Sequence, residues 1–141
     1  LKKNKKIAAS IYLSSSSVHN PRNGTYDYDI FLTTAGITKG GAAGLTGMGD
    51  YVYLDLNSIS TTGLVAGTYN WSNSRTGFSI VPGSATYLNY DFSAFTETTL
   101  AATAGTVDIA ISSTETTVTF SLTFADGKTV TGEWKGVLDT L

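Results

Sequence analysis

The chain has 141 residues with nine Lys and Arg, eleven Asp and Glu, one His and no Cys, and its formal net charge is −2. This length suits one domain that buries about two-thirds of its unfolded surface, so no metal or disulfide is needed to hold a core together. The charge balance offers no basic face to nucleic acid, and the lack of cysteine excludes thiol catalysis and Cys-ligated zinc.

The N-terminal segment predicts a basic tail followed by a first strand. Four lysines lie within residues 1–6, where we expect a flexible solvated tail. Apolar residues alternate over 7–13, and the Ser-rich segment 14–24, which holds the single His19, predicts a loop. The apolar stretch is too short and polar for a signal peptide. No run reaches the roughly 18 apolar residues of a membrane span, so we expect no transmembrane segment in this chain.

Alternation with a period of two residues continues through the middle of the chain and favours strands over helices. The glycine-rich segment 36–49 interrupts it, and we expect a loop there without a phosphate-binding pattern. In the segment 85–92, Leu88, Tyr90 and Phe92 are expected on the face opposite Tyr87, Asn89 and Asp91. Strands are predicted within 25–34, 50–58, 66–72, 78–81, 85–92 and 106–112.

The segment 117–138, "TVTFSLTFADGKTVTGEWKGVL", predicts a hairpin. A two-residue turn at Asp-Gly would mix the two faces of the ribbon. A three-residue loop over 125–127 instead sets Leu122 opposite Val130 and Phe120 opposite Gly132, with Gly127 in the left-handed conformation. Phe120 is then expected to lie across Gly132, where a strand glycine leaves a gap.

Short strands separated by turns and covered by no helix indicate an all-β fold. We predict one domain, residues 1–141, built as an antiparallel β-sandwich of about 8–10 strands. A closed, lipocalin-like β-barrel is the alternative, but such barrels usually have longer and more regular hairpins.

Few residues carry a catalytic pattern, so we expect no enzyme, no metal site and no cofactor. His19 is the only histidine, and no Gly-x-Ser-x-Gly motif is present. Asp27 and Asp29 share one face of a predicted strand, but the sequence does not decide whether any two carboxylates converge as a glycosidase pair requires.

Aromatic residues make the more specific pattern. Two triplets are predicted on outward strand faces, and flat aromatic rings beside Asp or Asn suit the apolar C–H faces of sugars. If the two strands are neighbours, the triplets form one patch; the alternative is that tyrosines simply pack across a half-exposed sheet. The candidate ligand-binding residues are Tyr51, Tyr53, Asp55, Tyr87, Asn89 and Asp91.

Five short motifs occur in order along the chain: "GTYDYDIFL", "YVYLDLNS", "LVAGTYNW", "GTVDIAIS" and the hairpin segment 117–138. In this order they resemble a family of small β-rich domains in predicted lipoproteins of Bacteroidetes, gut bacteria among them. The resemblance runs from about Gly24 to Leu138. It implies an exported, lipid-anchored, β-sandwich-like domain of unassigned molecular function and brings no catalytic residues. The chain departs from the family in lacking a lipobox cysteine and in its longer glycine-rich segment.

Two functions follow as hypotheses. The first is a non-catalytic extracytoplasmic binding or accessory domain, in the periplasm or at the cell surface, with a glycan or another surface protein as its ligand. Low charge, 14% of residues, and the outward tyrosines favour it. The second is an adhesin- or pilin-like subunit that forms homo-oligomers when its N-terminal strand, residues 7–13, is added to a neighbour's sheet.

Overall fold

The computed structural model describes residues 10–20, 25–41, 44–60, 62–94 and 96–140, which contain eleven strands and no helix. The all-β fold predicted from the alternation is confirmed. The basic tail expected over residues 1–6 lies outside the described residues. The strands are β1 (Ser10–Asn20), β2 (Thr25–Thr33), β3 (Ile37–Lys39), β4 (Leu45–Ser58), β5 (Gly67–Trp71), β6 (Ser79–Ile80), β7 (Ala85–Asp91), β8 (Thr96–Ser112), β9 (Glu115–Phe124), β10 (Thr129–Gly136) and β11 (Asp139–Thr140).

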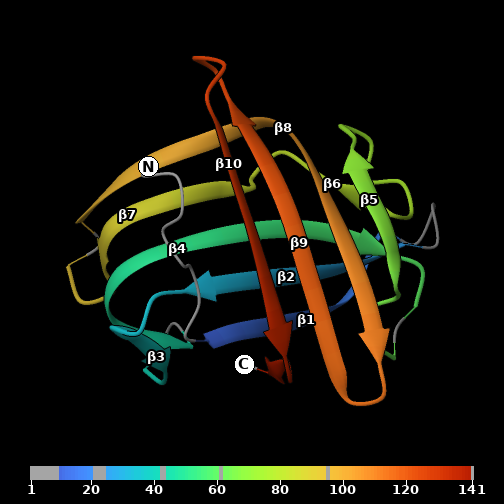
Figure 1. Cartoon of the computed structure of the whole chain (residues 1–141), viewed down its shortest axis with the longest axis horizontal. Coiled ribbons are helices and arrows are strands. Elements are labelled where there is room, and N and C mark those ends of the chain that lie inside the picture. Colours follow the sequence, from blue (N-terminus) through green and yellow to red (C-terminus); the bar gives the residue numbers. More distant parts are fainter. Residues whose placement is uncertain (1–9, 21–24, 42–43, 61, 95, 141) are drawn as a thin grey trace.

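The strands form one mainly antiparallel sheet that turns over to make two layers. β1, β2, β4 and β7 follow one another in the first layer, and β8, β9 and β10 make the second. Figure 1 shows β9 and β10 crossing in front of β2 and β4 at a steep angle. The long, curved β8 joins the layers, because residues 96–101 pair with β7 and residues 102–112 pair with β9.

The two ends of the sheet meet over a short contact. β11 follows directly after β10 and pairs in parallel with β1. Only two residue pairs are involved, Tyr12 with Asp139 and Leu13 with Thr140. The fold is therefore not a clear barrel, and its layered packing is its defining feature.

The main hydrophobic core lies between the two layers. Tyr69 is fully buried, and its hydroxyl donates a hydrogen bond to the Val65 carbonyl at 2.6 Å. Trp71 and Trp134 pack partly buried against the same core. Burying each large apolar side chain contributes about 1.5–3 kcal/mol. The fully buried members include Ile30, Leu32, Val52, Leu54, Leu56, Ile80, Val107, Val118 and Leu122.

The β9–β10 hairpin has the predicted register. Leu122 pairs with Val130 and Phe120 pairs with Gly132. The loop over residues 125–127 closes with Gly127 at φ +82°, and the Phe124 amide donates to the Lys128 carbonyl at 2.9 Å. The buried face determined this register, because the alternative would have exposed half of its apolar residues.

Two segments expected as loops contain strands. β1 continues to Asn20, so the loop expected from residue 14 is wrong: the backbone of this Ser-rich stretch pairs with β2, and pairing outweighs the low strand propensity of serine. Within the glycine-rich segment 36–49, β3 pairs with the start of β4, with Thr38 opposite Thr46. At Gly47, which has φ +98°, a Cβ would meet the Gly36 carbonyl oxygen, so glycine permits the close approach of the two strands there.

Candidate functional site

The outer face of β2, β4 and β7 carries four of the six residues predicted as a ligand site: Tyr51, Tyr53, Asp55 and Tyr87. β4 and β7 are indeed neighbours, and Tyr51 lies opposite Tyr87. The face divides into an aromatic half near β3 and an acidic half farther along β2 and β4, where Asp55 lies opposite Asp29. Tyr53 packs against the aromatic cluster and donates its hydroxyl to Asp29, so it contacts both parts of this face.

The aromatic half is a second, smaller core. Tyr51 is only 6% exposed and stacks on Tyr87, with ring centroids 4.4 Å apart and planes 9° apart. Ile37 and Leu45, which flank the β3–β4 turn, are buried against it. The β3–β4 hairpin thus covers this half, and a sugar ring would have to displace it to reach Tyr51. Phe31, Tyr53, Tyr90 and Phe92 pack around the same cluster.

A β-bulge changes the alternation predicted for β7. Asn89 has φ +53°, and the register between β4 and β7 shifts between Gly49 and Tyr51. The rings of Tyr87 and Tyr90 therefore contact each other edge to face at 5.7 Å, so their predicted placement on opposite faces is wrong. In the sequence, only the residue type at position 89 indicated this bulge, because Asn adopts the left-handed backbone conformation more readily than most residues.

Asn89 and Asp91 lie at the edge of the aromatic half and take local roles. The backbone amide of Asn89 donates a hydrogen bond to Asp50 Oδ1 at 2.9 Å. Asp91 Oδ1 accepts hydrogen bonds from the Ser93 amide and hydroxyl at 2.8 and 2.7 Å. The Ser93 contacts, the hydroxyl first, lower the pKa of Asp91. Asp91 thus stabilises the turn after β7.

The acidic half brings together three carboxylates and one arginine. One oxygen from each of Asp27, Asp29 and Asp55 lies within 4.8 Å of the other two. Arg75, from the loop between β5 and β6, places Nη2 3.2 Å from Asp55 Oδ2 and Nη1 3.5 Å from Asp27 Oδ1. Tyr53 donates its hydroxyl to Asp29 Oδ1 at 2.9 Å. Of these residues, only Asp55 and Tyr53 were predicted as ligand-binding residues from sequence. Asp27, Asp29 and Arg75 could not be assigned to the same site without knowing which strands and loops lie together.

Burial and nearby negative charges raise the pKa values of Asp55 and Tyr53 in the acidic half. Desolvation, followed by the hydrogen bond and the charge of Asp27, raises the pKa of Asp55 to about 7, although Arg75 opposes the shift. Burial, followed by the negative charge of Asp29, raises the pKa of Tyr53, whose phenol therefore stays protonated. Asp55 is therefore only partly ionised near pH 7, mainly because burial disfavours its charged form.

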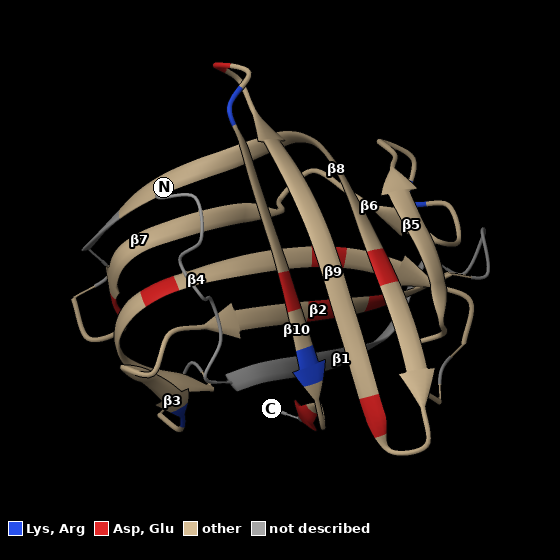
Figure 2. Ribbon diagram, in the orientation of Figure 1, with Lys and Arg blue, Asp and Glu red and all other residues tan. Residues whose placement is uncertain are grey.

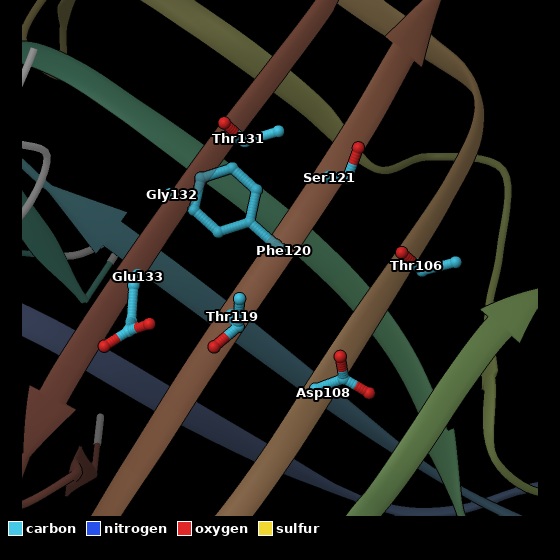
Figure 3. Close-up of a pocket in the computed structure, with 8 residues that line it drawn as sticks. All are labelled: Thr106, Asp108, Thr119, Phe120, Ser121, Thr131, Gly132 and Glu133. Carbon is cyan, nitrogen blue, oxygen red and sulfur yellow. The ribbon is translucent and has the colours of Figure 1, made fainter. Parts of the chain in front are cut away.

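The second layer carries an open groove of about 440 Å³ on its outer face. Figure 3 shows polar side chains from three adjacent strands around it, with the Phe120 ring lying beside Gly132 between β9 and β10. In the ladder, Ser121 pairs with both Thr106 and Thr131. The polar lining residues are Thr106, Asp108, Thr119, Ser121, Thr131 and Glu133.

The polar lining arises from alternation on three neighbouring strands. Thr119 and Ser121 point outward because Val118, Phe120 and Leu122 point into the core. Thr68 donates to Asp108 Oδ1 at 2.6 Å and holds that carboxylate at one side of the groove. The hairpin register already implied that Thr119 and Ser121 share one face. The groove itself could not be predicted, because the sequence does not show that β8 lies beside β9.

Acidic side chains predominate over basic ones around this groove. Figure 2 shows acidic segments on β8, β9 and β10 in the second layer and on β2 and β4 behind it. Asp108 lies on β8 and Glu133 on β10, whereas the groove lining contains no Lys or Arg. The groove therefore favours uncharged or cationic ligands over anionic ones.

Comparison with known proteins gave no relatives: no protein-family model, no curated protein and no solved structure matches the chain. Within the described residues, there is also no helix with the length and apolar character needed to cross a bilayer.

Proposed function

We propose that this chain is a non-catalytic, extracytoplasmic binding or accessory domain that holds a neutral glycan in the groove on β8, β9 and β10. The observation that carries the proposal is the set of hydroxyl and carboxylate side chains that line that groove beside the Phe120 ring. Four hydroxyl side chains from adjacent strands surround it, and Asp108 and Glu133 lie on its two outer strands. Its volume of about 440 Å³ lies within the range of small-ligand sites.

The lining matches the hydrogen-bonding chemistry of a polyhydroxylated ligand. Ser and Thr hydroxyls both donate and accept, and ionised carboxylates accept from two directions, as sugar hydroxyls require. Carboxylates also repel uronic acids, sulfated sugars and nucleic acids. A neutral glycan is therefore the favoured class of ligand.

The geometry of the acidic half supports a function without catalysis. A glycosidase separates its two carboxyl groups by about 5 Å or more to place the scissile bond between them. One oxygen of Asp55 instead lies within 4.8 Å of one oxygen of Asp27, and Arg75 donates hydrogen bonds to both carboxylates. The Arg75 guanidinium therefore lies against the two groups where a glycosidic bond would have to enter.

The extracytoplasmic assignment rests on composition and on the resemblance to Bacteroidetes lipoprotein domains. Charged residues are 14% of the chain, well below the usual quarter. Another surface protein remains the alternative ligand. For the pilin-like alternative, the N-terminal strand would have to leave its pairing with both β2 and β11, so we favour the binding function.

Retention on affinity gels that contain neutral polysaccharides tests the proposal. We expect the double variant Asp108→Asn/Glu133→Gln to lose retention about tenfold or more, because each lost charge-assisted hydrogen bond contributes about 1.5–3 kcal/mol. The matched control Glu115→Gln/Asp126→Asn removes the same charge outside the groove and should be retained like the wild type. Equal retention of the wild type and the groove variant would contradict the groove as the site. Loss in Tyr53→Ala/Tyr87→Ala alone would place the ligand on the aromatic half.

A further inference from the structure

The acidic half of the first layer gathers three carboxylates around one arginine. One oxygen from each of Asp27, Asp29 and Asp55 lies within 4.8 Å of the other two, and Arg75 contacts Asp27 and Asp55. All three side chains lie on one face of the β2–β4 ladder, where Asp29 is directly opposite Asp55. Charge alone does not make this cluster a site, since acidic groups often occur together on surfaces.

Asn57 provides an independent indication of a missing partner. It is fully buried, and neither its Nδ2 nor its Oδ1 has a hydrogen-bond partner in the described structure. Asn57 lies directly opposite Asp27 and two residues after Asp55, so its side chain projects from the same face of the sheet, toward the acidic cluster. Buried amide groups are nearly always paired, and an unpaired carbonyl oxygen beside carboxylates indicates that a bound group belongs there.

We propose that Asp27, Asp29, Asp55 and the Asn57 side-chain oxygen bind one Ca²⁺ ion. Carboxylate and amide oxygens are the ligands that Ca²⁺ takes in proteins, at about 2.3–2.6 Å, so two oxygens across the ion lie up to about 5 Å apart. The three carboxylate oxygens, all within 4.8 Å of one another, fit that span. Mg²⁺, with ligands at about 2.0–2.1 Å, needs a tighter octahedron.

Arg75 and the ion share the same carboxylates. Arg75 contacts Asp55 through two nitrogens and Asp27 through one, and its side chain is 30% exposed at the outer side of the cluster. Each carboxylate oxygen has more than one lone-pair direction, so Asp27 and Asp55 can contact both cations. The two positive charges repel each other, however. Removal of the Arg75 charge should therefore strengthen Ca²⁺ binding. If Arg75 and the carboxylates form only a structural ion pair, its removal should not lead to any Ca²⁺ binding.

The test uses Tb³⁺ as a luminescent probe and thermal unfolding in EDTA, CaCl₂ or MgCl₂. We expect Tyr excitation to sensitise Tb³⁺ emission, since Tyr53 contacts Asp29, and Ca²⁺ to displace the probe. At 100 times its Kd, Ca²⁺ should raise the Tm by about 5 °C or more, and Mg²⁺ should do so much less. Absence of both Ca²⁺-displaceable emission and a Ca²⁺-dependent Tm shift in the wild-type chain would overturn the proposal.

Variants identify the ligands. We expect Asp29→Asn and Asn57→Ala to weaken Ca²⁺ binding about tenfold or more, with Asp108→Asn, in the groove of the other layer, as an unchanged control. Arg75→Met should bind more tightly than the wild type and be stabilised by Ca²⁺ more strongly. Ca²⁺ binding unchanged by Asp29→Asn and Asn57→Ala would place the ion elsewhere and reject this site. The outcome is separable from glycan binding, because the groove variants Asp108→Asn/Glu133→Gln leave all four proposed ligands intact.

Discussion

The ring of Phe120 on β9 lies directly over Gly132 on β10. The two residues are paired in the ladder, and a Cβ placed on Gly132 would lie 2.6 Å from Cε1 of Phe120 and 2.7 Å from its Cζ. The missing side chain of Gly132 is therefore the space that the ring occupies. A strand glycine usually weakens a sheet, and here an aromatic neighbour covers the gap it leaves.

We expect Gly132→Ala to destabilise the protein by about 1–3 kcal/mol, the usual cost of overpacking. Phe120 is 3% exposed, so its ring cannot move aside without disturbing the core. Urea unfolding followed by circular dichroism measures the change. Gly63→Ala is the matched control, because a Cβ at Gly63 meets no atom within 4 Å and should change stability by less than about 0.5 kcal/mol. Equal stability of Gly132→Ala and the wild type would contradict the packing of the ring on this glycine.

The same hairpin shows which parts of the fold can be predicted from sequence. Its two strands are adjacent in the chain, one face is buried, and Asp126-Gly127 limits the turn, so pattern and turn chemistry alone select one register. The structure has that register throughout β10. Alternation also gave the all-β class, since it requires only local information.

Features that depend on contacts between distant segments could not be predicted from the sequence. Asp27 and Asp55 meet because β2 pairs with β4, and Arg75 reaches them from a loop that crosses the same face. The alternation predicts that each carboxylate lies on an outward face of its own strand, but it does not show which strands are neighbours in the sheet. The bulge at Asn89 had a similar effect, because one extra residue reverses every side chain that follows it in the strand.

Tyr51 is expected to hold the β3–β4 hairpin on the sheet. Replacement by Ala removes the ring that stacks on Tyr87 and contacts Ile37 and Leu45, at a cost of about 2–4 kcal/mol. Amide hydrogen exchange should accelerate in β3 and leave β9 and β10 unchanged. Met48→Ala, at a residue 59% exposed on the same strand, serves as the control. Uniform acceleration across all strands would mean that the aromatic half is not a separate packing unit.

Asn89 is expected to act through its backbone conformation. At φ +53°, Ala should cost about 1 kcal/mol relative to Asn, whereas Gly should be tolerated with little loss, because it has no Cβ to clash. Thermal unfolding of Asn89→Ala and Asn89→Gly makes the comparison. Similar losses in the two variants would indicate that the side-chain amide, rather than the conformation, matters at this position.

Asp55 is expected to make the protein less stable as pH rises from about 4 to 7. Its pKa is raised from 3.8 to about 7 in the folded state, so in this window the folded chain binds more protons than the unfolded chain, and the free energy of unfolding falls as pH increases. Burial is the largest cause of this raised pKa; the hydrogen bond and charge of Asp27 and the charge of Asp29 add to it, and Arg75 opposes it. At about 1.4 kcal/mol per pKa unit, the loss between pH 4 and pH 8 is roughly 2–4 kcal/mol.

Urea unfolding of the wild type and Asp55→Asn, at fixed ionic strength in EDTA, isolates this contribution, because all other titrating groups are common to both proteins. Asn cannot ionise, so the stability of the wild type relative to the variant should decline from pH 4 to about 7 and level off above that. Asp108→Asn, at a carboxylate of the second layer outside the acidic cluster, is the matched control for the loss of one carboxylate. A difference between the wild type and Asp55→Asn that stays constant with pH would mean that Asp55 is already ionised near pH 4. In that case Arg75, rather than a bound proton, would compensate its charge in the folded protein.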